Sequence, residues 1–343
     1  MEKQPDLVAK SRLIDEMSFK NRFIEFITQW EVILLFIAVG VFVFFNAKSR
    51  YFLDWFNLMN ATFQFSEKAI MALPMIFIIM CGDIDISIAS IIALCAYVVG
   101  QAALGGASIP TLIVLSLLVG TLAGLFNGVM ITTLEMPAIA VTLATQSIYR
   151  GISIGLLGDQ ARTKFPANFG VFGQQFVPGT IIPIEFVLYL ILMLLFAFIL
   201  HKTTYGRRLY AIGNSPEAAR FSGINVKAIR IINFTLTGFF CGLTAILLAS
   251  RILSVRSNIA TGWDLEIITL VVLGGVAITG GKGSVFGVFV GSLVVGYLKF
   301  GMGLLKLSGT LMTIVIGSLL ITAVLLPRLL DLYKANRKLR MQA

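Results

Sequence analysis

The sequence predicts an all-α protein that crosses a membrane about ten times, and three observations lead to this prediction. Of the 343 residues, 57% are hydrophobic and 13% are charged, and the mean hydropathy is +0.92. Soluble domains carry a charge on roughly a quarter of their residues. Apolar segments long enough for a bilayer recur along the chain, and the basic residues gather in short stretches between and beside them.

A helix needs about 20 apolar residues to cross a bilayer, and fewer where neighbouring helices shield its ends. The segments that meet this requirement are residues 31–46, 63–81, 86–104, 109–133, 137–156, 183–200, 229–250, 266–280, 284–301 and 308–327. The chain therefore divides into an N-terminal segment (1–30), a membrane domain (31–327) that contains a polar loop (201–230), and a basic tail (328–343).

The distribution of basic residues predicts the orientation. The chain has 27 Lys and Arg against 17 Asp and Glu, a net charge of +10 that in a soluble protein would suggest nucleic acid. Here 16 of the 27 lie in residues 1–30, 201–230 and 328–343, as the positive-inside rule and anionic lipid would place them. We expect these three segments and both termini to be cytoplasmic, and no nucleic acid partner. Six crossings before residue 201 and ten in total agree with this.

The polar loop 201–230 carries the signals of a short surface helix. Ser215 suits the N-cap, Pro216 the first helical position, and Gly223 a left-handed end. Glu217, Ala218 and Ala219 continue the helix between them. A helix of about two turns is not stable alone in water. We therefore expect it to pack on its own helices and on a cytoplasmic partner.

Two carboxylates, Asp83 and Asp85, lie between very apolar segments in the sequence CGDIDIS (81–87). Charged residues at membrane depth are functional candidates by default, so Asp85 is a candidate for lining a translocation pathway. Alternatively, the stretch is a tight cytoplasmic connection between segments 63–81 and 86–104, and the carboxylates cap the following helix. The sequence leaves both interpretations open.

Other polar residues lie inside the apolar segments. The further candidates for the translocation pathway are Asn60, Gln64, Asn127, Thr142, Thr145 and Gln146. Each alone is typical of hydrogen bonding between membrane helices. As a set of amides and hydroxyls they favour an uncharged polar cargo over an ion. Gly120, Gly124 and Gly128 form a row of small residues at helix-packing spacing.

No catalytic or metal site is expected. The glycine-rich stretch 272–287 is not a phosphate-binding loop, because Val276 stands where the first glycine is required and Gly283 follows Lys282 in place of Ser or Thr. It is predicted to be a tight cytoplasmic hairpin. The external side would carry the connection 157–182 and a second loop, 251–265, whose Arg251 and Arg256 suggest a docking surface for an acidic partner.

Several stretches together resemble one transporter family. SPEAARFSGINV, from Ser215, resembles the EAA-xxx-G coupling loop of ABC importer permeases, although the Ile-x-Leu-Pro extension found in the broader pattern is missing. Four stretches resemble the ribose-type branch of these permeases, and the likeness covers most of residues 55–327. They are GDIDIS, PAIAVTLATQSIYRG, AIGNSPEAARFSGI and VVLGGVAITGGKGS.

The resemblance implies a function and a set of partners. It implies an ABC importer permease fold in the bacterial inner membrane, with a cytoplasmic coupling helix at Ser215, Pro216, Glu217, Ala218, Ala219 and Gly223. The implied partners are a second permease subunit, cytoplasmic ATPase subunits that use ATP and Mg²⁺, and a periplasmic or extracellular sugar-binding protein. The implied cargo is a monosaccharide or a sugar-like small molecule, such as rhamnose, autoinducer-2, ribose, another pentose or a galactoside. No cofactor is expected to be bound by this chain. The alternative is a secondary transporter driven by an ion gradient, which needs an ion-binding carboxylate such as Asp83 or Asp85.

Overall fold

The computed structural model describes residues 30–342, and it is all-helical over this range apart from two isolated β-bridges. Its helices are α3 Trp30–Lys48, α4 Trp55–Met80, α5 Ile88–Leu104, α6 Ile109–Thr133, α7 Ala138–Leu157, α8 Val171–Gln174, α9 Ile184–Lys202, α10 Thr204–Asn214, α11 Pro216–Phe221, α12 Val226–Ile252, α13 Trp263–Leu273, α14 Val285–Leu304 and α15 Gly309–Gln342. The predicted all-α class is confirmed. Except for Trp30, the predicted N-terminal segment lies outside the described residues.

A helix occupies each predicted apolar segment, but not every helix has the length of a span. Within residues 30–342, five helices are long and apolar enough to cross a membrane, namely α4, α6, α9, α12 and α14. Shorter apolar stretches lie at Val32–Lys48, Ile88–Leu104 and Gly309–Leu325. The protein therefore has several apolar helices of membrane-spanning length, and a total of ten crossings stays a prediction.

The prediction that residues 266–280 form one span is wrong, because α13 ends at Leu273. Gly275, two residues later, adopts a left-handed conformation at φ 86°, and the Trp30 indole N–H donates to the Leu273 carbonyl at 2.8 Å. At a rise of about 1.5 Å per residue, this helix of 11 residues is about 16 Å long. That is about half of a hydrocarbon core of about 30 Å.

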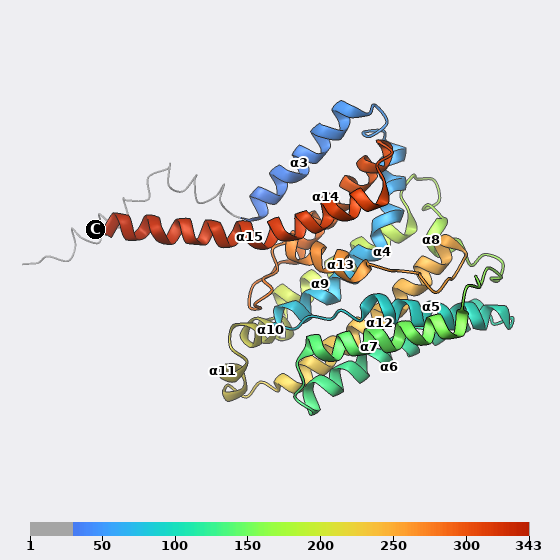
Figure 1. Cartoon of the computed structure of the whole chain (residues 1–343), viewed down its shortest axis with the longest axis horizontal. Helices are drawn as coiled ribbons and strands as arrows, with labels where there is room; N and C mark the ends of the chain where they lie inside the picture. Colours follow the sequence, from blue (N-terminus) through green and yellow to red (C-terminus); the bar gives the residue numbers. More distant parts are fainter. Residues whose placement is uncertain (1–29, 343) are drawn as a thin grey trace, which may run out of the picture.

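The prediction of a tight connection at residues 81–87 is also wrong. This stretch, here called the interrupted segment, has no helix or strand and runs through the body of the protein between α4 and α5 (Figure 1). Asp83 is 5% exposed and Asp85 is fully buried. Irregular backbone at membrane depth is tolerated where protein surrounds it or where it lines a cavity. The burial of its carboxylates places this segment in the protein interior.

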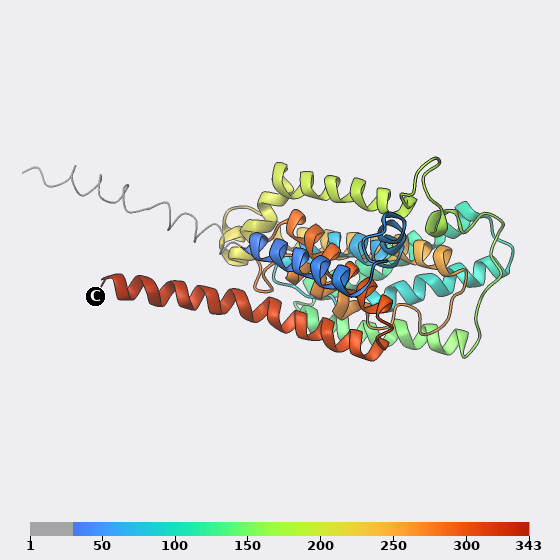
Figure 2. The ribbon, with the colours of Figure 1, turned by 90° about the horizontal axis from the view of Figure 1, so that it is seen from above.

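The helices form an elongated bundle with α10 and α11 at one end, called the α11 end below (Figure 1). The connections 157–182 and 251–265 lie at the opposite end. Helices α5, α6, α7 and α12 pack together, and α4 joins them to α9, α13 and α14. Helices α9 and α15 lie along opposite flanks (Figure 2). Helix α15 continues without a break through the predicted basic tail to Gln342.

The predicted row of small residues lies in a very close helix contact, between α6 and α12. A Cβ atom added to Gly120 would lie 2.2 Å from the Gly238 carbonyl oxygen, and one added to Gly124 would lie 2.2 Å from that of Phe234. Such distances are possible only without side chains, so the glycines let the two backbones touch.

Candidate functional site

The short surface helix predicted in the polar loop is α11. Ser215 is extended, at φ −161° and ψ 104°, and its hydroxyl accepts a hydrogen bond from the Ala218 N–H at 3.2 Å. Pro216 occupies the first helical position. Gly223 follows the helix at φ 82°, and its N–H donates to the Arg220 carbonyl at 3.0 Å. The capped helix is confirmed as local structure, whereas its role in coupling stays a prediction.

Helix α11 is attached to the bundle by one side only. Ala219 is 3% exposed, and its carbonyl accepts a hydrogen bond from the Ile224 N–H at 3.1 Å. Glu217, Ala218 and Arg220 are exposed, and Phe221 is 91% exposed. The helix thus presents a charged and aromatic surface to the outside.

Helix α10, which precedes α11, was not predicted from the sequence. Thr203 caps it by accepting a hydrogen bond from the Gly206 N–H at 3.3 Å. Leu209 and Ile212 are fully buried, while Arg207 and Arg208 on the other face are exposed. The spacing of three between the buried residues is the signal that could have identified this amphipathic helix.

Beside α11 lies a hollow of about 490 Å³, between α11, the α6–α7 connection and the start of α12. Three of its charged groups, those of Glu135, Lys227 and Arg230, form ion pairs. Lys227 donates to Glu135 at 2.9 Å, which lowers the pKa of the Glu135 carboxyl below its usual value. Arg230 donates to Asp83 of the interrupted segment at 2.6 Å. Asp83 therefore links the interrupted segment to α12, next to the α11 end.

Four of the predicted pathway residues lie in or next to the interrupted segment, namely Asp85, Asn127, Thr142 and Thr145. Asp85 accepts hydrogen bonds from the Ser87 N–H at 2.8 Å and from the Ser87 hydroxyl at 2.6 Å. Asn127 donates to the Ser87 hydroxyl at 2.8 Å. The Thr142 hydroxyl lies within 3.4 Å of the Ile84 carbonyl, and that of Thr145 donates to the Thr142 carbonyl at 3.3 Å.

All four of these side chains are buried within this chain, and Asp85, Asn127 and Thr142 have no exposed surface. One oxygen of Asp85 and the amide oxygen of Asn127 have no hydrogen-bond partner among residues 30–342. The arrangement joins the interrupted segment to α6 and α7. The tight-connection interpretation is thus excluded, a role of Asp85 in lining the pathway stays a prediction, and the contacts of its carboxylate hold the backbone of the interrupted segment.

Asn60 and Gln64 lie elsewhere, on the exposed surface of α4. Gln64 lines two hollows of about 470 and 480 Å³, one toward α14 and one toward the end of α12. Gln146 of α7 approaches Asp264 of α13, with its amide nitrogen 3.4 Å from a carboxylate oxygen. The predicted pathway residues therefore form a buried group and an accessible group.

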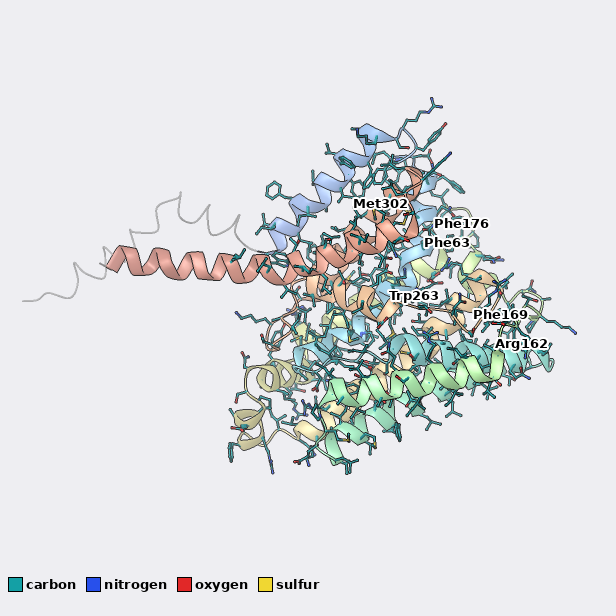
Figure 3. All side chains as sticks on the ribbon, viewed as in Figure 1. Phe63, Arg162, Phe169, Phe176, Trp263 and Met302 are labelled. Atoms are coloured by element: carbon teal, nitrogen blue, oxygen red, sulfur yellow. The ribbon has the colours of Figure 1, made fainter. Side chains whose placement is uncertain are left out.

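A network of charged residues, which we did not select from the sequence, lies next to Gln64. Glu266 of α13 pairs with Lys68 of α4 at 3.0 Å and with Lys299 of α14 at 2.8 Å. The Lys68 ammonium also lies 4.8 Å from the ring centre of Trp263, a residue that Figure 3 labels in the middle of the bundle. Charged residues inside apolar segments, such as Lys68 and Lys299, are the signal that could have identified this network.

Arg251 forms a second pair in the same region. Its guanidinium donates to the two oxygens of Glu67 at 2.7 and 2.9 Å, and Glu67 is fully buried. The expectation that Arg251 belongs to a docking surface is therefore wrong, because its guanidinium forms an ion pair with the buried Glu67 carboxylate. Glu185 of α9 is also fully buried, and the described part of the chain offers its carboxylate no hydrogen-bond partner.

Comparison with known proteins agrees with the resemblance seen in the sequence. Residues 57–324 match the family described as "Branched-chain amino acid transport system / permease component". The chain is 35% identical to the autoinducer 2 import system permease protein LsrD of Escherichia coli O9:H4 (strain HS) over 301 residues, which cover 86% of this chain and 91% of LsrD.

A second relative is the ribose import permease protein RbsC of Bacillus subtilis (strain 168). The identity is 32% over 296 residues, which cover 86% of this chain and 90% of RbsC. No solved structure matches the chain. Together with the apolar helices, the family match makes this chain a multi-pass protein of the inner membrane. It belongs to the family of ABC importer permeases, and its relatives are of the ribose type.

Proposed function

We propose that this chain is the permease subunit of an ATP-driven importer for a monosaccharide or a sugar-like small molecule, with autoinducer-2, ribose and rhamnose as candidate cargoes. Its family and the import systems named for its relatives support the class of transporter. The observation that carries the coupling part of the proposal is α11, a capped helix held by one side that exposes Glu217 and Phe221.

The coupling helix contacts a cytoplasmic ATPase subunit through the residues predicted from the sequence, Ser215, Pro216, Glu217, Ala218, Ala219 and Gly223. Ser215 and Gly223 fix the ends of the helix, and Ala219 attaches it to the bundle. Glu217 and Phe221 then contact the partner. The ATPase subunit binds ATP and Mg²⁺, and this chain carries out no hydrolysis of its own.

The α11 end and both termini face the cytoplasm. The basic residues of the polar loop 201–230 and of the tail support this orientation. The opposite end, with connections 157–182 and 251–265, then faces the sugar-binding protein. Connection 157–182 is fixed to α12, because Ser250 accepts a hydrogen bond from the Gly173 N–H at 2.9 Å and donates to the Phe169 carbonyl at 2.7 Å.

The translocation pathway runs along the exposed face of α4 that carries Asn60 and Gln64, and a second permease subunit, identical or related, closes it. The hollows on both sides of Gln64 support this assignment. Amide groups can hydrogen-bond to the hydroxyls of a sugar without adding charge. The interrupted segment behind this face is stabilised by four buried side chains, those of Asp85, Asn127, Thr142 and Thr145. Gln146 stabilises α13.

The paired charges near Gln64 favour this function over ion-driven transport. A carboxylate that binds a transported cation must be free to do so. Glu67 and Glu266 instead accept hydrogen bonds from arginine and lysine side chains. Neither carboxylate is therefore free to bind a transported cation, as ion-driven transport would require.

Reconstitution tests the proposal. The chain would be placed in liposomes with candidate ATPase and binding-protein partners, and uptake of labelled autoinducer-2, ribose and rhamnose would be measured with and without ATP. We expect uptake that needs ATP and the binding protein, and that is lost in Glu217→Lys while the variant still enters the membrane. Uptake by the chain alone under a proton or sodium gradient would refute the proposal.

A further inference from the structure

Directly beside the coupling helix, three segments of the chain meet through their backbones. They are the end of α10 at Gly213, the end of α4 at Met80, and the glycine-rich connection 274–284 at Gly280 and Gly281. A Cβ atom added to Gly213 would lie 2.0 Å from the Met80 carbonyl oxygen and 2.2 Å from the Gly281 nitrogen. We call this contact the junction.

Hydrogen bonds hold the three segments together at the junction. The Gly281 N–H donates to the Met80 carbonyl at 3.0 Å, and the Tyr210 hydroxyl of α10 donates to the Gly283 carbonyl at 2.8 Å. Gly280 and Gly281 adopt left-handed conformations at φ 84° and 76°, which bring the connection against α10 without side chains in between. Backbones in direct contact cannot shift past one another by changing rotamers.

The junction lies between the coupling helix and the two breaks in the helical bundle. On one side, only Ser215 separates α10 from α11. On the other side, Met80 is followed at once by the interrupted segment 81–87, which contains Asp85, and Gly281 belongs to the connection between α13 and α14. A displacement of α11 therefore reaches both breaks through one set of contacts.

A second set of contacts couples α10 to the same region. The Tyr205 hydroxyl donates to the Asn233 side-chain oxygen at 2.6 Å, and the Asn233 amide donates to the Phe77 carbonyl at 3.3 Å. Both ends of α10 are thus bound to the last turns of α4. Helix α10 is therefore held against α4 rather than lying free on the surface.

From these contacts we infer that Gly213, together with Met80, Gly281 and Tyr210, transmits movement of the coupling helix to the interrupted segment and to the α13–α14 connection. The inference rests on the proposed function, because it assumes that an ATPase moves α11. Gly213 and Tyr210 are positioning residues: they act on the pathway through Met80 and Gly281. The junction sets how much cargo moves for each ATP hydrolysed.

The test measures cargo imported per ATP hydrolysed in liposomes that contain the complete importer. Gly213→Ala places a methyl group where the Met80 carbonyl and the Gly281 nitrogen now lie, so the segments must separate. We expect this ratio to fall about tenfold or more, in the range of coupling between two sites, while the variant still assembles with the ATPase. Gly155→Ala in α7 is the matched control, since a Cβ atom there meets no atom of residues 30–342 within 4 Å.

Tyr210→Phe is the second variant, because Gly213→Ala could prevent folding. It keeps the ring and removes only the hydrogen bond to the Gly283 carbonyl. We expect the ratio to fall severalfold with normal assembly. A wild-type importer that shows ATP-dependent uptake, combined with an unchanged ratio in the variants that assemble, would overturn the inference and leave the proposed function intact. No ATP-dependent uptake by the wild type would instead refute the proposed function.

Discussion

Replacing Arg251 by methionine removes the only hydrogen-bond donors that the described structure provides for the Glu67 carboxylate. Glu67 is fully buried, whereas the Arg251 side chain is 25% exposed. Breaking a buried pair by removing one partner costs about 3–5 kcal/mol, because the remaining charge is left buried without compensation. Since water reaches part of Arg251, we expect a loss near the lower limit, about 3 kcal/mol.

The two single variants should differ in how far they lower the free energy of unfolding. Glu67→Gln leaves Arg251 partly in contact with water, so we expect it to cost less than Arg251→Met, about 1–2 kcal/mol. The double variant should be more stable than the sum of the two single effects predicts, by about 1–3 kcal/mol, as found for residues that share one network. Equilibrium unfolding of the purified protein in detergent or nanodiscs, followed by tryptophan fluorescence or circular dichroism, measures all four proteins.

The exposed pair Lys227–Glu135 provides the matched control. Its atoms are as close, at 2.9 Å, but the two side chains are 57% and 75% exposed. Water screens such a pair, so Lys227→Met and Glu135→Gln should have additive effects within the error of the measurement. If the Arg251 and Glu67 substitutions were additive as well, the reasoning from burial would be refuted.

Three further predictions follow from other contacts. Gly238→Ala should destabilise the protein by about 1–3 kcal/mol, because its Cβ atom would lie 2.1 Å from the Gly120 carbonyl oxygen; thermal unfolding checks this, and unchanged stability would contradict it. Asn127→Leu should change stability by less than about 1.5 kcal/mol and preserve uptake, since Asn127 is buried against Ser87; a selective loss of uptake would place it in the pathway instead. Trp30→Phe should cost about 1 kcal/mol, because the indole loses its bond to the Leu273 carbonyl; denaturant unfolding with equal stability of both proteins would show that this bond is not needed.

Features that depend on local order in the chain could be predicted from the sequence. The helix at 109–133 was predicted with the bounds of α6, because a long apolar stretch has few alternatives in a membrane. The capped helix α11 was predicted because Ser215, Pro216 and Gly223 each satisfy a local backbone requirement. The glycine row in α6 indicated a packing face, although not its partner α12.

Features that depend on distant partners were decided only by the tertiary structure. The apolar sequence 266–280 continues past Leu273, but Trp30, more than 200 residues earlier, hydrogen-bonds to the carbonyl where the helix ends. The stretch 81–87 has the composition of a turn, yet Arg230 and Asn127 hold its polar groups inside the protein.

The charge network shows the same division. The sequence contains Glu67, Lys68 and Arg251, but nothing in their order says that Glu67 pairs with Arg251 and Lys68 with Glu266. Helical periods, caps and membrane-length segments arise from interactions within a few residues, so the sequence determined them by itself. The pairing of charges, the ends of interrupted helices and the contact at Gly213 arise from residues brought together by folding, and only the tertiary structure decided them.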